Sequence, residues 1–197
     1  LQSLDLEENR LSGSLPSTWA GGSSGSGSGS GSGSALSSNL FYMSLRLNQI
    51  GGTLPASYQA LTQLQFWDME GNDLTGTIPT EYGAALTRLE GWFLESNGGL
   101  SGPLPSELGQ LESLKQLLVF DNQLTGTVPT SFGNLSNLEF FWFHGNSLMG
   151  SVDDVFCDWP DEPDMIGDCL GEDPKITCSC CKSCCAGSLE NQTCSTV

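Results

Sequence analysis

Eight cysteines within one segment, from Cys157 to Cys194, are the densest group of reactive side chains in this sequence of 197 residues. Closely spaced thiolates bind zinc or another soft metal, whereas oxidised thiols pair as disulfides. An even number in a short segment with few apolar residues favours disulfides, because such a segment needs covalent cross-links to fold. We predict disulfides, an oxidising compartment and no metal, with a soft-metal site as the alternative. The eight are Cys157, Cys169, Cys178, Cys180, Cys181, Cys184, Cys185 and Cys194.

Side chains that could catalyse a reaction are few. His144 is the single histidine, and no motif of a nucleophile, a phosphate-binding loop or a dinucleotide site occurs. We interpret it as an exposed contact at the rim of a binding surface. Glu70 and Glu95 occupy equivalent positions of a sequence repeat, a placement that could suit paired glycosidase carboxylates, but glutamate there is also ordinary surface charge. We therefore predict that the protein is not an enzyme and has no cofactor.

The balance of charge narrows the class of partner. The formal net charge is -17, from 23 acidic and 6 basic residues. Nucleic acids and anionic lipid surfaces need basic patches, so we exclude both as partners; a cation, a basic peptide or a neutral glycan fits, and plain solubility is the alternative. No apolar run reaches the roughly 18–20 residues that a membrane span needs. We expect a processed or incomplete N-terminus, and membrane attachment only through segments absent from this chain.

A repeat of 24 or 25 residues organises the first part of the chain. Apolar residues stand eight, five and three positions before each of six asparagines, and a Gly-x-apolar-Pro segment follows, as at Gly76-Thr-Ile-Pro79. The first step, from Leu1 to Leu40, is 39 residues, and removing residues 21–34 restores 25. We predict that these residues form an inserted flexible Gly/Ser loop, either natural or a linker. The asparagines are Asn9, Asn48, Asn72, Asn97, Asn122 and Asn146.

Each position of the repeat has a physical reason. Strands of three to five residues alternate their side chains, so Leu4 and Leu6 point inward and Asp5 points outward. Stacked asparagines can bond the backbone groups of neighbouring coils that burial would otherwise leave unpaired. Residues 106–111 and 131–135 then form short helical turns. We expect an extra residue within 97–100 to form a small bulge, and Asp153, in place of proline, to mark the end of the array.

These patterns predict an α/β solenoid of six coils over residues 1–152, closed by an acidic, disulfide-rich cap over residues 153–197. Three large aromatic residues, Trp67, Trp92 and Phe141, occupy inward positions where leucine is usual. We predict that they lie in the core and that the two tryptophans stack, because they occupy the same position of adjacent coils.

Residues 114–138 match the plant-specific class of leucine-rich repeats nearly throughout, and the resemblance covers about three quarters of the chain. It implies a right-handed solenoid with a concave parallel sheet. Members include receptor-kinase ectodomains, receptor-like proteins and polygalacturonase inhibitors, which bind peptides, steroids, co-receptors or wall enzymes, mostly outside the cell. The cysteine-rich ending resembles that of diatom and related algal leucine-rich-repeat proteins.

The outward strand positions divide into two zones. The acidic zone comprises Asp5, Glu7, Asp68 and Glu70 with one cation, Arg46, and the aromatic zone comprises Phe93, Phe120, Phe140, Trp142 and His144. Exposed aromatic clusters usually mark interaction sites; the alternative is that these side chains cover one another or a neighbouring subunit. The candidate ligand-binding residues are Tyr42, Arg46, Phe66, Glu70, Phe93, Glu95, Phe120, Phe140, Trp142 and His144.

We therefore predict a secreted or cell-surface recognition module, for example a receptor-like ectodomain, that binds a protein, peptide or glycan on its concave sheet. A structural or adhesive protein of a wall or matrix, and a secreted enzyme inhibitor, are the alternatives. Two acceptor motifs for N-glycosylation, at Asn134 and Asn191, agree with a secretory route.

Overall fold

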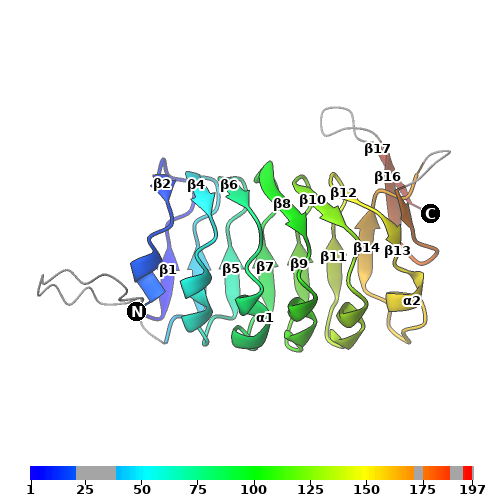
Figure 1. The fold of residues 1–197 in the computed structure, drawn as a ribbon, viewed down its shortest axis with the longest axis horizontal. Coiled ribbons are helices and arrows are strands. Elements are labelled where there is room, and N and C mark those ends of the chain that lie inside the picture. Colours follow the sequence, from blue (N-terminus) through cyan, green and yellow to red (C-terminus); the bar gives the residue numbers. More distant parts are fainter. Residues whose placement is uncertain (21–38, 171–174, 187–192, 197) are drawn as a thin grey trace, which may run out of the picture.

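The chain winds into a solenoid of stacked coils, as predicted (Figure 1). The computed structural model describes residues 1–20, 39–170, 175–186 and 193–196. The predicted Gly/Ser loop and Asn191 lie outside these residues. Each coil supplies one strand to each of two sheets and then a short helical turn. Among the described segments, no helix has the length and apolar character needed to cross a bilayer.

The large sheet has nine strands in the order β1-β3-β5-β7-β9-β11-β14-β16-β17. All neighbours are parallel except β16 and β17. Tyr42 lies beside Phe66, and Phe66 beside Gly91, so equivalent positions of the repeat form straight columns, as expected. Its first six strands are β1 (Ser3–Asp5), β3 (Tyr42–Ser44), β5 (Phe66–Asp68), β7 (Gly91–Phe93), β9 (Gln116–Leu118) and β11 (Phe140–Trp142).

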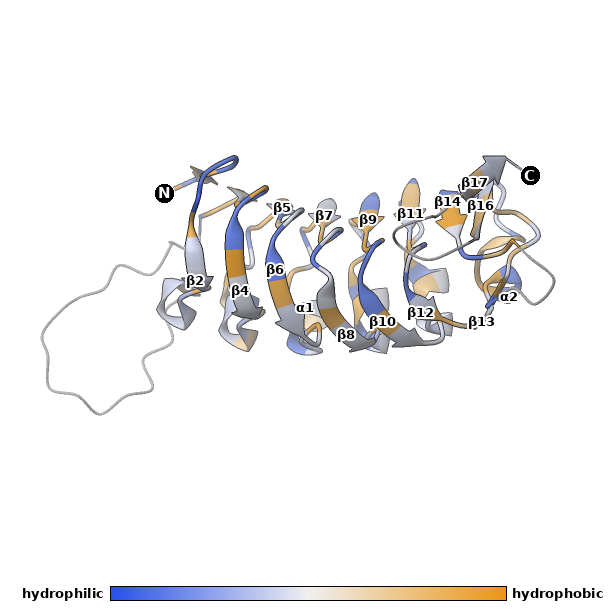
Figure 2. Ribbon diagram, turned by 90° about the horizontal axis from the view of Figure 1, so that it is seen from above, coloured by the Kyte–Doolittle hydropathy of each residue, from blue (hydrophilic) through white to orange (hydrophobic). Residues whose placement is uncertain are grey.

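The small sheet has six parallel strands, in the order β12-β10-β8-β6-β4-β2. Its register is staggered: Thr53 lies beside Thr75 rather than beside its repeat equivalent, Thr77. In Figure 2 these strands change between polar and apolar along their length, because residues such as Ile50 and Leu74 point into the core. The strands are β2 (Ser12–Ser14), β4 (Gln49–Thr53), β6 (Asp73–Gly76), β8 (Gly99–Pro103), β10 (Gln123–Gly126) and β12 (Ser147–Leu148).

Short helices close the coils on the remaining side, and the two that the sequence predicted are present. They are η1 (Ser17–Ala20), η2 (Ala56–Ala60), α1 (Glu81–Ala85), η3 (Ser106–Gln110) and η4 (Thr130–Asn134). The core between helices and sheets holds the predicted aromatic residues: Trp67, Trp92 and Phe141 have no exposed surface. The two tryptophan rings stack with centroids 5.5 Å apart at 14°, which confirms that prediction.

The predicted asparagine ladder forms from Asn48 onward, whereas Asn9 is exposed and its amide donates to carbonyls of its own coil. The Asn72 amide donates to the carbonyls of Leu45 and Met69, and its Oδ1 accepts from the Ile50 amide of the preceding coil. Asn48, Asn97 and Asn146 repeat this pattern. Asn122 departs from it, because its Oδ1 is buried without a partner. The extra residue of the preceding coil displaces the amide that would complete the bond.

The large sheet continues into the segment predicted as a cap. Strand β14 (Asp164–Gly167) pairs with β11 and is followed by β16 (Ser183–Ala186) and β17 (Thr193–Thr196). Helix α2 (Asp153–Phe156) lies beside η4, and β13 (Gly150–Ser151) pairs with β15 (Ile176–Thr177). The Phe156 ring packs against Phe141 at 5.8 Å, and Phe143 is fully buried, so this segment covers the end of the solenoid core.

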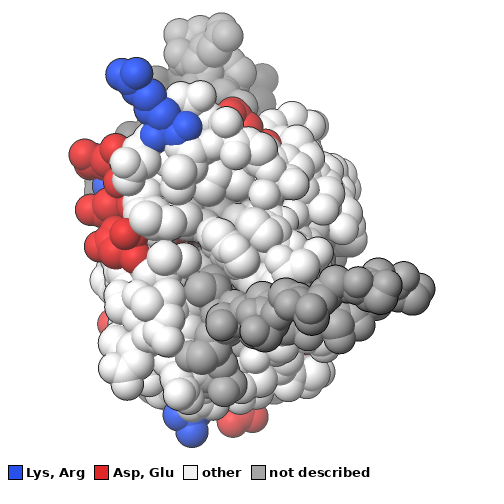
Figure 3. All heavy atoms as spheres, turned by 90° about the vertical axis from the view of Figure 1, so that its left-hand side faces the viewer, with Lys and Arg blue, Asp and Glu red and all other residues white. Residues whose placement is uncertain are grey.

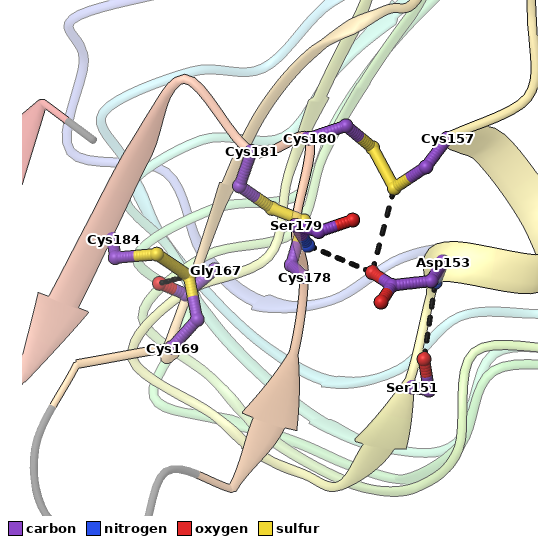
Figure 4. The surroundings of a disulfide bond; sticks show 10 residues. All are labelled: Ser151, Asp153, Cys157, Gly167, Cys169, Cys178, Ser179, Cys180, Cys181 and Cys184. Carbon is purple, nitrogen blue, oxygen red and sulfur yellow. Dashed lines mark hydrogen bonds between the residues drawn. A yellow bond between two sulfur atoms is a disulfide. The ribbon is translucent and has the colours of Figure 1, made fainter.

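All eight cysteines form disulfides: Cys157–Cys180, Cys169–Cys184, Cys178–Cys181 and Cys185–Cys194. Figure 4 shows two of them side by side above Asp153, the residue that replaces the repeat's proline. Its carboxylate accepts a hydrogen bond from the Ser179 amide at 2.8 Å. The departure at Asp153 therefore both begins α2 and fastens the cysteine-rich loop to it.

Candidate binding face

Four residues of the aromatic zone, Phe120, Phe140, Trp142 and His144, form one continuous cluster on the outward side of the large sheet. Phe120 stacks on His144 with ring centroids 4.7 Å apart at 7°. Trp142 contacts Phe120 at 6.2 Å and Phe140 at 6.4 Å. Each of these side chains is half-buried. The rings therefore cover part of one another, which agrees in part with the alternative interpretation. The rest of their surface is available to a partner.

Phe66 extends this aromatic surface towards the acidic zone. Gly91 separates it from Phe93 across adjacent strands, and a Cβ atom at Gly91 would lie 2.8 Å from the Phe66 ring and 3.0 Å from the Phe93 ring. The missing side chain thus lets both rings lie over one backbone position. Phe66 is 36% exposed, and the half-buried Tyr42 lies next to it. Gly91 was not among the site residues predicted from the sequence, although the repeat placed it in the same column as Phe66.

His144 differs from its predicted setting, since it is half-buried rather than exposed. Burial lowers the pKa of its imidazole, and the carboxylates of Asp121 and Asp168 oppose that shift. A pKa below the ordinary 6.5 leaves the ring neutral at pH 7. Its stacking on Phe120 therefore makes it part of the apolar surface rather than a charged rim contact.

The acidic zone uses its one cation internally. Arg46 Nε lies 2.5 Å from Glu70 Oε2, and Arg46 Nη1 lies 3.9 Å from Glu8. The hydrogen bond to Glu70 raises the pKa of Arg46. Burial raises the pKa of Asp68 to about 6; the Glu70 backbone amide, which donates to this carboxylate, opposes the shift, and the charge of Glu70 adds to it. Figure 3, seen from the N-terminal end, shows carboxylates gathered on one side of the molecule.

Glu95 is the unexpected member of the face. It follows β7 in the column between Glu70 and Phe120, and it was predicted as an exposed contact. Only 5% of it is exposed, and its Oε2 has no hydrogen-bond partner. Burial raises the pKa of this carboxyl to about 8, and the charges of Glu70 and Asp68 raise it further. Glu95 is therefore a protonated acid at neutral pH.

Strand β14 supplies a seventh row that sequence reasoning missed. Ile166 lies beside Trp142 and is half-buried, so it lengthens the apolar surface. Asp168 accepts hydrogen bonds from the backbone amides of Gly145 and Asn146 at 3.1 and 3.3 Å. A hollow of about 470 Å³ lies between Phe140, Asp164 and Lys182 at the edge of this row. This strand was not predicted from the sequence because its coil lacks the ladder asparagine, although the 24-residue step from Phe140 to Asp164 is present.

Two columns on the outward side of the small sheet are uncharged and rich in hydroxyls, and the exposed Asp73 of β6 lies beside them. Serine and threonine residues occupy most positions of these two columns, and we call them the hydroxyl ladder. Gly51, Pro103 and Met149 occupy the remaining positions. The Thr53 methyl lies over Gly76, where a Cβ atom would approach it to 2.9 Å, and Thr77 lies over Gly102 in the same way. Because the glycines have no side chain, the threonine methyls can lie directly over the backbone at these positions. The ladder comprises Ser12, Ser14, Thr53, Thr75, Thr77, Ser101, Thr125, Thr127 and Ser151.

Comparison with known proteins agrees with the geometry. The Leucine Rich Repeat family profile matches residues 1–21 and 113–135. Receptor-like protein 14 of Arabidopsis thaliana is 35% identical over 120 residues, which is 59% of this chain and 10% of that protein. The plant peptide hormone receptor RGFR1, solved in complex with RGF2, superposes with a TM-score of 0.71 at 27% identity, over 85% of this chain and 25% of the receptor.

A second kind of solved structure is similar to the same extent. A plant ice-binding protein superposes with a TM-score of 0.70 at 27% identity, over 85% of this chain and 48% of that protein. The chain thus spans a tenth of its curated relative and between a quarter and a half of these two structures.

Proposed function

We propose that this chain, which folds as a leucine-rich-repeat solenoid, is an extracellular recognition module whose large sheet binds an extended peptide or protein segment. The observation that carries the proposal is that Phe93, Phe120 and Trp142 lie on three successive coils of this face, with Phe120 and Trp142 in ring contact. Half-exposed aromatic clusters of this kind are typical of interaction sites. The four disulfides agree with an extracellular setting.

The shape of the surface favours an extended ligand. Neighbouring strands lie about 4.8 Å apart, so a chain that crosses the strands meets each row of aromatic residues in turn. The similarity to a peptide hormone receptor supports this class of partner. Asn134 lies in η4 and is exposed, so a glycan there would project from the helical turns and leave the large sheet open.

Selection of peptides on the folded chain tests the proposal, because the natural partner need not be known. A displayed library of random linear heptapeptides provides the probe, and the enriched peptides are then titrated by calorimetry. We expect Trp142→Ala and Phe120→Ala each to weaken binding by roughly tenfold or more, since a lost aromatic anchor typically costs ~2 kcal/mol. The control Glu112→Ala alters an exposed side chain in the turn after η3 and should leave affinity unchanged. Failure to enrich any peptide, or equal affinity in both aromatic variants, would refute the proposal.

A second candidate function is supported by a different surface. The hydroxyl ladder presents threonine methyls and hydroxyls in two rows, and none of its members carries a charge. Such a regular surface fits an ordered crystal lattice better than an irregular protein partner. Together with the similarity to a plant ice-binding protein, this supports adsorption to ice.

Thermal hysteresis and inhibition of ice recrystallisation test this candidate. Thr75→Tyr and Thr125→Tyr place bulky rings in the middle of the ladder and should abolish any activity of the unaltered protein. Thr87→Tyr changes an exposed threonine outside both sheets and serves as the matched control. An unaltered protein without activity, or ladder variants as active as the control, would remove this candidate and leave the peptide-binding proposal intact.

A further inference from the structure

One oxygen of the buried Glu95 carboxyl, Oε2, has no hydrogen-bond partner among the described residues. Within the described segments, Glu95 is the one acidic or basic residue that is buried. The other buried polar residues are Ser44, Asn48, Asn72, Asn97, Asn122 and Asn146. Arg46, the one cation of the acidic zone, forms an ion pair with Glu70. Leaving a carboxyl oxygen buried and unpaired is unfavourable, so the folded chain retains this group at a cost.

The surroundings of Glu95 differ on its two sides. Along its column, Glu70 precedes it and Phe120 follows it; on its own strand, Phe93 lies two residues earlier. Glu70 and Asp68 are close enough for their charges to act on the Glu95 carboxyl. The group therefore lies where the acidic zone meets the aromatic zone, with negative potential on one side and ring faces on the other.

An arginine side chain satisfies both sides at once. Its planar guanidinium can donate two hydrogen bonds to one carboxylate and can stack on an aromatic face. An ammonium group supplies charge without this planar contact. A neutral polar side chain could bond Glu95 but would gain nothing from Glu70 and Asp68.

We propose that Glu95 is a specificity-determining residue that receives a basic side chain, preferably arginine, from an extended peptide whose neighbouring apolar side chain lies on Phe120 and Trp142. This inference rests on the proposed peptide-binding function and names the class of peptide. Glu70 and Asp68 attract the cation, the rings of Phe93 and Phe120 flank it, and the unpaired oxygen of Glu95 accepts its hydrogen bond.

The spacing of the two ligand residues follows from the sheet. An extended peptide advances ~3.3 Å per residue, so side chains on one face recur every ~7 Å. Coils are about 4.8 Å apart, and a side chain two residues beyond the arginine therefore reaches the space between Phe120 and Trp142. The recognised pattern is a basic residue, any residue, then an apolar or aromatic residue, in whichever direction the peptide crosses the strands.

Binding of the cation should release a proton. Glu95 is protonated near neutral pH, because burial and the charges of Glu70 and Asp68 raise its pKa to about 8, with its own backbone hydrogen bond and then Arg46 acting in the opposite direction. A bound guanidinium favours the ionised carboxylate and lowers this pKa. Affinity should therefore increase as the pH rises towards about 8 and level off above it.

The experiment compares an enriched arginine-containing heptapeptide with its analogue in which citrulline replaces arginine. Citrulline keeps the planar group and removes the charge. For the unaltered chain we expect the citrulline peptide to bind at least tenfold more weakly, and calorimetry in two buffers of different ionisation enthalpy to show proton release. In Glu95→Gln, an isosteric neutral variant, the difference between the peptides should fall below threefold and the proton release should disappear.

Glu7→Gln is the matched control, since Glu7 occupies the same column and is exposed. It should keep both the tenfold preference and the proton release. Enriched peptides without a basic residue, or an unchanged preference in Glu95→Gln, would overturn the inference; if Trp142→Ala still abolished their binding, the peptide-binding function would stand. A library that yields no enriched peptide would overturn both.

Discussion

Replacing Glu95 by glutamine should change how the stability of the protein depends on pH. The ordinary pKa of the group is 4.5, and burial raises it to about 8 in the folded chain. Below pH 4.5 both states are protonated and the carboxyl has no effect. Between these values the unfolded chain loses a proton that the folded chain keeps, so unfolding becomes more favourable as the pH rises. Above about pH 8 both states are ionised and the loss is complete.

The size of the effect follows from the interval between the two pKa values. At about 1.4 kcal/mol per pH unit, the free energy of unfolding of the unaltered protein falls by roughly 4–5 kcal/mol over this interval. The free energy of unfolding of the glutamine variant does not fall in this way. This decrease is a large part of the roughly 5–15 kcal/mol by which domains are usually stable. A constant contribution from packing of the glutamine amide does not depend on pH, so the change with pH is the quantity to measure.

Urea unfolding followed by tryptophan fluorescence at pH values from 4.5 to 8.5 measures the difference. The free energies of unfolding of Glu95→Gln and the unaltered chain should diverge steadily over this range, with the variant more stable at the high end. Glu112→Gln, at an exposed position, controls for the loss of one negative charge from an acidic protein. A difference between Glu95→Gln and this control that stays constant with pH would show that Glu95 is ionised in the folded chain.

Three further predictions concern the solenoid itself. Asn97→Ala should reduce the free energy of unfolding by about 1 kcal/mol more than Asn122→Ala, because Asn122 already lacks one ladder bond; equal losses in urea titrations would contradict this. Truncation after Val152 should expose Phe143 and lower hydrogen-exchange protection in β11, whereas unchanged protection in a soluble truncated chain would show that the cap is dispensable. Deleting residues 21–34 should leave the melting temperature within a few degrees, since the entropy of loop closure grows only logarithmically with length; a large decrease, measured by calorimetry, would contradict this.

The solenoid was predictable because its determinants are local and repeated. Three apolar positions and one asparagine recur in every coil, so the stacking of Tyr42, Phe66 and Gly91 in one column followed from counting residues. The core positions of Trp67 and Trp92 followed in the same way. Strand β14 was not predicted, because it keeps the step of the repeat but has neither the asparagine nor the leucines that flank it.

The site was less predictable, because burial depends on side chains from several coils. Alternation in a strand placed Glu95 outward, and only the packing of neighbouring coils shows that it is covered. His144 is half-buried for the same reason, since its ring stacks on a residue of the previous coil. The pairing of the cysteines required the course of the chain through β14 and β16, which spacing alone does not determine.

The stack of Trp67 on Trp92 gives the molecule an internal optical reporter. Two indoles held 5.5 Å apart at 14° inside a rigid core are close enough for their electronic transitions to couple. Coupled transitions produce paired bands of opposite sign in circular dichroism, and these bands vanish when the rings separate. The third and fourth coils therefore carry a label of their own. Their separation can be told apart from fraying at the ends of the array without any added chromophore.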